Sequence, residues 1–414
     1  MKRRRVVVTG IGLVSPFGGD ALDFFGRLLA AESAVRFFES PDVPRPLAIP
    51  AVRCDGFDVD GVLGRALAGT MDRFSQLGAG AALAAWRDAG FATDDRSEKT
   101  DCGVAWGTAL GGTLAYERGY RELWLNHRPR ISPLSVVLGM NNAAAAHIAI
   151  LFGLANACLS YTVACASSAV AIGEAFRRIR AGEATVMLAG GSDAPHAYGV
   201  VRAWEALRVL APGDADNAPR ACRPFDSGRS GLVLGEGGGA IVLEERDHAL
   251  ARGATIHAEL AGYGSTCDHT HLVRPEMRGQ LRAIAQAMQD AGLARDEVDY
   301  INAHGTATRE GDPTEIAAIR EYFGGRARHI AVSGTKSMHG HLLGAAGVVE
   351  AIVTVLALRR GVVPPTAWLE NVDPDCSGVR HVAGSAQRVP ALRAALSNSF
   401  AFGGSNAVLA FRTH

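Results

Sequence analysis

The segment Tyr161–Phe176 reads YTVACASSAVAIGEAF and places Cys165 where a strand-like run gives way to a helix-like run. The helix would continue through FRRIRAG, with Cys165 in its first turn, where unpaired backbone N–H groups and the helix dipole favour negative charge. A thiol at this position is expected to have a lowered pKa and to react as a thiolate. The alternative is a structural cysteine, since free cysteine is among the most buried residue types. This stretch alone leaves both interpretations open.

The composition is that of an ordinary globular protein. The chain has 414 residues, of which 48% are hydrophobic and 20% charged, enough for two core units. Lys plus Arg and Asp plus Glu both number 42, so no overall charge would attract nucleic acid or a membrane surface. No segment has the length and apolarity of a membrane span, and no signal peptide is recognisable, so we expect a cytoplasmic protein.

Cysteine and lysine usage limits the kinds of site that the chain is expected to contain. The seven cysteines contain no CxxC pair, so neither a disulfide framework nor a metal site is predicted, although a lone reactive thiol stays open. Only three of the 42 basic residues are lysines, at positions 2, 99 and 336. Because lysine and arginine differ in shape and in hydrogen-bonding geometry, Lys336 is expected to need a compact ammonium group.

The chain alternates strand-like apolar runs with helix-like runs of small residues, which is typical of layered α/β proteins. A strand ending at Cys165 leads into a helix over 166–181, and a strand ending near Ser333 leads into the helix-like run HLLGAAGVVEAIVTVLALRRG, residues 341–361. Both helices consist largely of Ala, Gly and Val, which suits helices buried between sheets. We therefore predict a duplicated α/β unit with its seam near residue 250.

Three further segments lie at predicted strand ends or loops, where α/β folds place their sites. They are NAHGTATREGDPTE (302–315), VSGTKSMHGHLLGAAG (332–347) and SNSFAFGGSNA (397–407). Each has a structural alternative, namely a histidine bonded within the fold, a helix cap or a hairpin turn. The occurrence of all of them beside the Cys165 segment favours a shared site.

These motifs resemble those of the β-ketoacyl-acyl-carrier-protein synthases, in the elongating type with a Cys-His-His site. The likeness runs from VVVTGIGLVSPFG to the last strand. It implies a thiolase-like fold with duplicated α/β halves in a five-layer α-β-α-β-α body. Residues 1–250 would carry the nucleophile, and residues 251–414 would carry the two histidines.

The resemblance also implies the reaction. Cys165 would take an acyl chain from an acyl carrier protein, and malonyl carrier protein would lose carbon dioxide to give an enolate that attacks this thioester. His304 and His341 would donate to the enolate oxygen. Backbone N–H groups of Cys165 and Phe402 would form the oxyanion hole, and Phe402 would also act as a gate.

Further roles follow from the same resemblance. Lys336, paired with Glu350, would hold the histidines in their working protonation states, and His339 is expected to be loop structure. The residues expected to contact substrate are Thr306 and Thr308 on the phosphopantetheine arm, Leu110 in the acyl pocket, and Phe400. No cofactor is expected to be bound, because phosphopantetheine arrives on the carrier protein.

The pathway and the assembly stay open. Fatty-acid elongation by a homodimer is the main hypothesis, and the alternative is an aryl-polyene or type II polyketide ketosynthase, in a heterodimer with a chain-length-factor-like subunit. Leu63–Arg73 is poor in basic residues and Glu205 stands where an arginine is expected, so we expect carrier recognition to differ from that of fatty-acid enzymes. A non-catalytic partner subunit is disfavoured because Cys165 and both histidines are present. A thiolase is disfavoured because a second histidine replaces its second cysteine.

Overall fold

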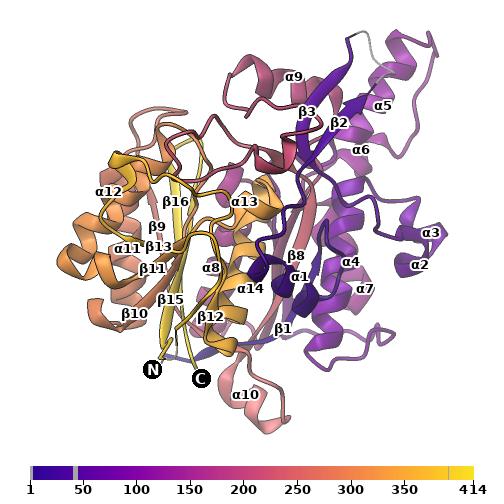
Figure 1. The fold of residues 1–414 in the computed structure, drawn as a ribbon. Helices are drawn as coiled ribbons and strands as arrows, with labels where there is room; N and C mark the ends of the chain where they lie inside the picture. The colour runs from indigo at the N-terminus through magenta and orange to yellow at the C-terminus, as the bar shows by residue number, and fades with distance from the viewer. Residues whose placement is uncertain (1–2, 41–44, 390) are drawn as a thin grey trace.

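The computed structural model describes residues 3–40, 45–389 and 391–414, and its helices and strands alternate as the sequence predicts (Figure 1). Eleven strands form one mixed sheet. Their order is β13 (Arg380–His381), β11 (Ala331–Ser333), β10 (Val298–Asn302), β15 (Ala394–Phe400), β16 (Ser405–Arg412), β9 (Ala258–Cys267), β1 (Val6–Val14), β8 (Gly237–Glu245), β6 (Val186–Asp193), β4 (Cys102–Gly107) and β5 (Cys158–Tyr161).

Helices cover both halves of this sheet and fill the space between them. On the outer side of the N-terminal half lie α4 (Arg73–Asp88) and α7 (Ala143–Phe152), and on the outer side of the C-terminal half lie α11 (Met277–Ala291) and α12 (Gly311–Phe323). The central layer is α8 (Ser167–Ala181) and α14 (Ala346–Arg360), which share the largest core cluster. This is the expected α-β-α-β-α layering.

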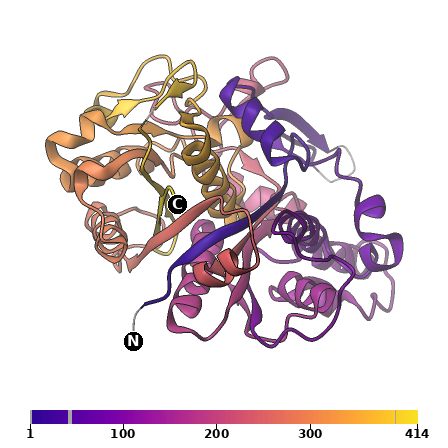
Figure 2. The same ribbon diagram turned by 90° about the horizontal axis from the view of Figure 1, so that it is seen from below.

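The two sheet halves are joined at one edge. In β1, Val6–Val8 pairs with Leu260–Ala258 of β9 while the whole strand pairs with β8, so the two sheets form one continuous surface. Figure 2 shows β1 crossing between the halves. Residue 250 lies in α10 (Arg246–Ala251), which separates β8 from β9, and the domain division there stays a prediction.

Small residues allow the two central helices to approach each other and the sheets, as their composition predicts. A Cβ on Gly347 of α14 would lie 2.8 Å from the Cβ of Ala169 in α8, and a Cβ on Gly173 would lie 2.4 Å from the ring of Tyr263. Such distances are sterically forbidden. The tight central layer fixes where both helices begin, and their N-terminal ends carry the site.

One predicted boundary is wrong. The run 341–361 is helical only from Ala346, because Leu343 has a left-handed backbone with φ 48° and opens a 3₁₀ turn over Leu343–Ala345. His341 is instead extended: its N–H donates to Val233 O at 2.7 Å, and its carbonyl accepts from Gly235 N at 3.0 Å. This extended segment places the His341 side chain beside the start of α8.

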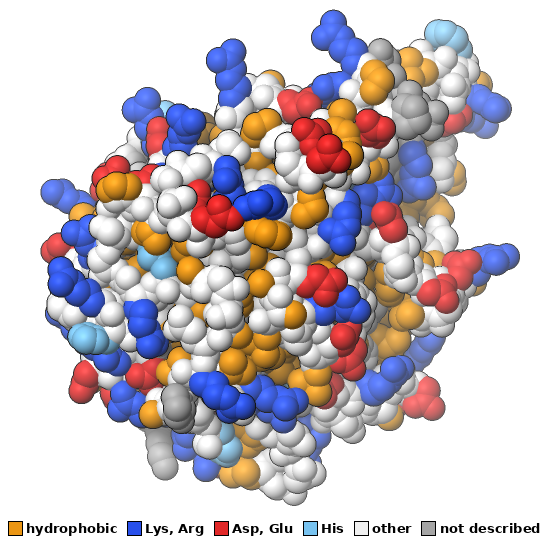
Figure 3. All heavy atoms as spheres, viewed as in Figure 1, with side chains coloured by type: hydrophobic (Ala, Val, Ile, Leu, Met, Phe, Trp, Pro, Cys, Tyr) orange, Lys and Arg blue, Asp and Glu red, His pale blue; other side chains and the backbone are white. Residues whose placement is uncertain are grey.

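The remaining elements surround this body. They are α1 (Ala21–Leu29), β2 (Arg36–Ser40), β3 (Leu47–Val52), α2 (Val59–Leu63), α3 (Arg65–Ala68), α5 (Thr113–Trp124), α6 (Ser135–Gly139), α9 (Tyr198–Ala206), β7 (Leu234–Gly235), β12 (Val362–Val363), α13 (Lys336–His339) and β14 (Gln387–Arg388). Basic and acidic side chains are interspersed on the face in Figure 3, in keeping with their equal totals. Within the described residues, no helix combines the length and apolarity needed to cross a bilayer.

Candidate active site

Cys165 lies on a sharp turn between β5 and α8. It is the middle residue of a 3₁₀ turn over Ala164–Ala166, just before the first α-helical turn at Ser167 rather than within it. Ala164 has φ 45°, a left-handed conformation that costs a non-glycine residue about 1 kcal/mol. The turn directs the cysteine side chain toward the second half of the molecule.

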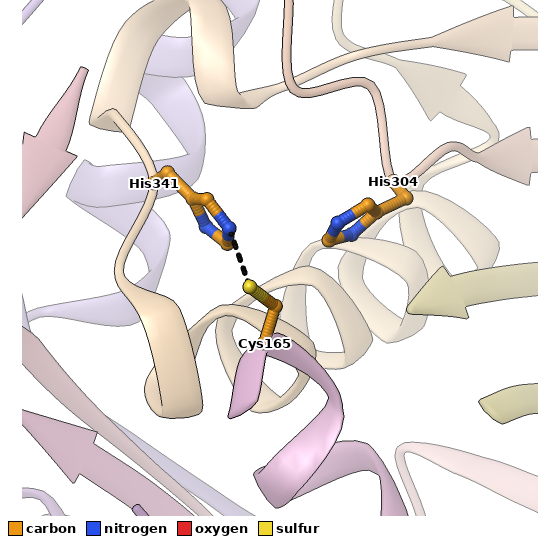
Figure 4. Close-up of side chains that lie close together, drawn as sticks. All are labelled: Cys165, His304 and His341. Carbon is orange, nitrogen blue, oxygen red and sulfur yellow. Dashed lines mark hydrogen bonds between the residues drawn. The ribbon is translucent and has the colours of Figure 1, made fainter. Parts of the chain in front are cut away.

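Two histidines from that half meet the thiol (Figure 4). His341 Nε2 lies 3.0 Å from Cys165 Sγ, and the rings of His304 and His341 stand edge to face with centroids 5.4 Å apart. All three residues are buried. The structure therefore brings together the three residues for which the resemblance implied the central roles.

Lys336 lies fully buried behind His304 and has a partner for each of its three N–H bonds. Its ammonium lies 3.3 Å from His304 Nδ1 and 2.5 Å from His304 O, and it forms an ion pair with Glu350. A planar guanidinium could not direct its donors at three acceptors grouped around one point. This geometry explains why lysine occupies position 336 in a chain that otherwise uses arginine.

The Lys336 ammonium also selects the tautomer of His304. Because Nδ1 accepts from Nζ, the ring proton must be on Nε2. Burial, and secondarily the charge of Lys336, holds the pKa values of His304 and His341 well below their usual range. Both imidazoles are therefore neutral near pH 7, and His304 presents an N–H donor through Nε2.

The predicted low pKa of Cys165 is wrong for the free enzyme. Burial raises the pKa of this thiol to about 12, and the opposing effects of Lys336 and of the N–H groups of Phe402 and Cys165 do not outweigh it. Cys165 is therefore a thiol near neutral pH, and the N–H groups of Phe402 and Cys165 are directed at its sulfur. His341 Nε2 is placed to accept the thiol proton.

Glu315 is a site residue that sequence reasoning missed. Its two carboxylate oxygens accept from the N–H groups of His304 at 2.8 Å and Gly305 at 2.9 Å, and Asn398 donates to it at 3.0 Å. This buried carboxylate holds the backbone that carries His304. The signal was its place in the NAHGTATREGDPTE motif, eleven residues after the histidine.

His339 belongs to the fold rather than to the reacting centre, but it is not loop structure as predicted. It ends the short helix α13 and is buried, with ring nitrogens 3.0 Å from Thr335 Oγ1 and 2.9 Å from Gly340 O. Burial lowers its pKa to about 3. Two hydrogen bonds within the segment fix the ring away from Cys165.

A cavity of about 370 Å³ opens onto the Cys165 thiol. Thr306 and Thr308 line it, and their hydroxyl oxygens are hydrogen-bonded to each other at 2.9 Å. Phe400 and Phe402 line it as well. The ring of Phe402 stacks on Trp204, with centroids 5.8 Å apart and an interplanar angle of 22°.

Leu110 lies beside this site but does not line the same cavity. It packs in the cluster that contains Cys165 and Leu343, and its N–H donates to Asp193 at 3.1 Å. Asp193, missed by sequence reasoning, also accepts from the N–H of Gly344 at 2.6 Å and so ties the Leu110 loop to the turn before α14. The role of Leu110 in an acyl pocket stays a prediction.

The spacing of the three central residues would also suit a soft metal ion. One ligand atom each from Cys165, His304 and His341 lies within 4.8 Å of the others. However, the ammonium of Lys336 lies 3.3 Å from His304 Nδ1 and would repel a second cation in this buried setting. The electrostatics favour a nucleophile with two imidazoles.

Comparison with known proteins covers the whole chain. Models described as the N-terminal and C-terminal domains of β-ketoacyl synthase match residues 3–249 and 257–370. Nodulation protein E of Rhizobium sp. (strain N33) is 44% identical over 412 residues, 99% of each chain. The 3-oxoacyl-acyl-carrier-protein synthase 2 of Coxiella burnetii is 38% identical over 99% of this chain and 98% of its own.

Solved structures agree with these relatives. The ishigamide ketosynthase/chain length factor superposes with a TM-score of 0.91 at 33% identity, covering 100% of both chains. The AntDE:AntF complex, described as a type II PKS acyl-carrier protein with its ketosynthase bound to the hexaketide, superposes at 0.90 with 28% identity, also covering 100% of both chains. The fold class predicted from the sequence is confirmed.

Proposed function

Because the chain belongs to the β-ketoacyl synthase family, we propose that it extends an acyl chain held on Cys165 by decarboxylative condensation with malonyl carrier protein in fatty-acid elongation. The protein is a ketosynthase, an enzyme of the acyltransferase class, as the sequence predicted. The observation that carries the proposal is the convergence of the Cys165 thiol, the His341 and His304 imidazoles and the Lys336 ammonium.

In the first step, the acyl group passes from the carrier thioester to Cys165. Sγ attacks the thioester carbon while its proton moves to His341 Nε2, 3.0 Å away, and this proton then leaves with the departing thiol of the arm. The developing oxyanion would accept from the N–H groups of Cys165 and Phe402. The reactive sulfur is therefore produced from a thiol by an imidazole base during the step, and not held beforehand as the thiolate that the sequence predicted.

In the second step, the malonyl unit loses carbon dioxide and its enolate oxygen accepts from the histidines. His304 donates through Nε2, the tautomer that Lys336 selects. His341 Nδ1 has no hydrogen-bond partner among the described residues, so this ring can change tautomer and donate through Nε2 as well. The enolate carbon then attacks the acyl thioester, and the released Sγ takes up one proton to balance the lost carbon dioxide.

The substrate arrives on a carrier protein. Thr306 and Thr308 are the proposed contacts of the phosphopantetheine arm, which reaches Cys165 through the cavity and needs no resident cofactor. The AntDE:AntF structure, in which a similar ketosynthase is bound by a carrier protein, supports this partner. The reaction is proposed to take place in the cytoplasm.

The proposed assembly is a homodimer. Strand β5 ends the sheet with one edge unpaired among the described residues, and exposed apolar side chains gather on the nearby elements α5 and α6. Trp124 and Val136 are 69% and 64% exposed. Exposed apolar side chains that are grouped in this way mark a protein–protein interface. A heterodimer with a chain-length-factor-like subunit is the second possibility, supported by the description of the ishigamide structure.

The second candidate function is the same condensation in an aryl-polyene or type II polyketide pathway. Identity is higher to a nodulation protein, at 44%, than to the 3-oxoacyl-acyl-carrier-protein synthase 2 of C. burnetii, at 38%, and the AntDE:AntF neighbour is described as a type II PKS complex. Saturated and polyenoyl carrier proteins should therefore be compared as acyl donors, with malonyl carrier protein as extender and mass spectrometry of the products. Turnover of saturated chains supports elongation, turnover of polyenoyl chains alone supports the second candidate, and no condensation product from either would refute both.

A further inference from the structure

Three arginines from three separate segments line the mouth of the cavity. Arg208 follows α9, Arg274 precedes α11, and Arg309 lies in the loop between His304 and α12. All three are exposed, and none of their guanidinium groups has an ion pair or hydrogen bond with any described residue. One carboxylate, Glu310, shares this rim and is exposed as well. The mouth thus carries an excess of unpaired positive charge.

Arginines next to the rim are paired. Arg202 donates to Glu205 at 2.6 Å, so the acidic residue that stands where an arginine was expected neutralises its neighbour. Arg229 forms an ion pair with Asp373 at 2.5 Å and donates to Thr308 O at 3.0 Å. Because pairing is available to guanidinium groups so close by, the rim arginines are cations that the fold itself leaves free.

The interior of the cavity is less charged than its mouth. Below the rim, Thr306 and Thr308 offer hydroxyl groups, and the neutral imidazoles lie at the thiol. A ligand that fits this pattern has an anion at its outer end and a neutral polar chain leading inward. A phosphate on a pantetheine chain has that order of groups.

We propose that Arg208, Arg274 and Arg309 form a binding subsite for the phosphate diester at the base of the carrier protein's phosphopantetheine arm. The inference rests on the proposed function and deepens it, since it names a positively charged contact for the carrier's arm in a chain that is poor in basic residues at Leu63–Arg73 and has Glu205 where an arginine is expected. Guanidinium groups suit this task because their N–H forks match phosphate oxygens. The arginines belong to the cavity lining itself, which favours the phosphate over acidic side chains of the carrier surface.

The test uses three acyl donors that differ in one group at a time. They are an acyl-pantetheine without phosphate, the same acyl-phosphopantetheine, and the same acyl carrier protein, each assayed by the rate of Cys165 acylation. The variants are Arg208→Gln, Arg274→Gln, Arg309→Gln and their combination. Arg328→Gln is the matched control: Arg328 is also exposed and without a contact to a described residue, but it lies in the turn Gly324–His329 that leads into the amino end of β11, away from the cavity.

For each variant, the rate with a phosphorylated donor is divided by its own rate with acyl-pantetheine, which cancels any general damage to the fold. We expect this ratio to fall about threefold for one arginine and about 30-fold for the combination, because exposed ion pairs are individually weak. The fall should be shared by both phosphorylated donors and should shrink as salt rises.

The outcomes distinguish a failure of the arginine subsite from a failure of the proposed function. Unchanged ratios, or a fall equal to that of Arg328→Gln, would overturn the subsite. A fall with the carrier protein but not with acyl-phosphopantetheine would overturn it in favour of acidic side chains on the carrier. If the unaltered enzyme is acylated at Cys165 by none of the three donors, the proposed function fails instead.

Discussion

Replacing Lys336 with Met should damage condensation more than acylation. Lys336 is the only charged partner of Glu350 and the only donor to His304 Nδ1 among the described residues. The substitution keeps an unbranched side chain of similar length and removes the ammonium. His304 then loses the contact that keeps its proton on Nε2, where the enolate needs it.

The structure sets the magnitude. Breaking a buried ion pair by removing one partner costs about 3–5 kcal/mol of folding free energy. Burial already raises the pKa of Glu350 to about 7 although Lys336 lowers it, so without Lys336 the carboxyl takes up a proton at neutral pH. The loss in the free energy of unfolding should therefore lie near the lower end, at about 3 kcal/mol. Loss of one oxyanion donor slows the step it serves about 100-fold or more.

The assay follows both half-reactions on the same preparation. Single-turnover acylation of Cys165 by an acyl carrier protein is compared with discharge of the preformed acyl-enzyme by malonyl carrier protein. Lys99→Met is the matched control. Lys99 Nζ, like Lys336 Nζ, has three acceptors, here carbonyl oxygens at 2.9–3.1 Å, but Lys99 precedes the amino end of β4, away from Cys165. Equal slowing of the two half-reactions in Lys336→Met would refute the positioning role.

Three further predictions concern groups around the thiol. Because the pKa of Cys165 is raised to about 12, its alkylation by iodoacetamide should accelerate with pH throughout the neutral and alkaline range, and a plateau already reached below neutrality would contradict this. Glu315→Gln leaves one backbone N–H at His304 or Gly305 without its acceptor, so calorimetry should show a loss of about 1–3 kcal/mol in unfolding free energy, whereas an unchanged melting temperature would be inconsistent with it. Trp204→Ala removes the ring stacked on Phe402, worth about 1 kcal/mol, so the acyl-enzyme should hydrolyse faster, and an unaltered hydrolysis rate would count against a gate held by stacking.

The parts of the fold that depend on local pattern could be predicted from the sequence. Runs of Ala, Gly and Val predicted α8 and α14 as buried helices, and the four motif segments do meet at their N-terminal ends. The scarcity of lysine predicted a special environment for Lys336, which the structure shows as three acceptors around one ammonium. The helix and motif signals are local to short stretches of the chain, and the lysine signal is a matter of composition alone.

Features that depend on contacts distant in sequence could not be predicted. The pKa of Cys165 is set by burial under both halves of the molecule, which outweighs the local effect of the turn. Leu343 adopts φ 48° because the chain must bring His341 to the thiol and then enter α14, and nothing in HLLGAAG marks that break. The Trp204 stack joins α9 to the hairpin turn after β15, segments almost 200 residues apart.

The most direct test of the account is intact-protein mass spectrometry of the enzyme before and after each half-reaction. Incubation with an acyl carrier protein should add one acyl mass, peptide mapping should place it on Cys165, and malonyl carrier protein should then remove it as a β-ketoacyl product. Cys165→Ala should acquire no acyl mass under the same conditions. Acylation of an exposed cysteine such as Cys158 or Cys267 in place of Cys165, or an adduct that malonyl carrier protein does not discharge, would contradict the central claim.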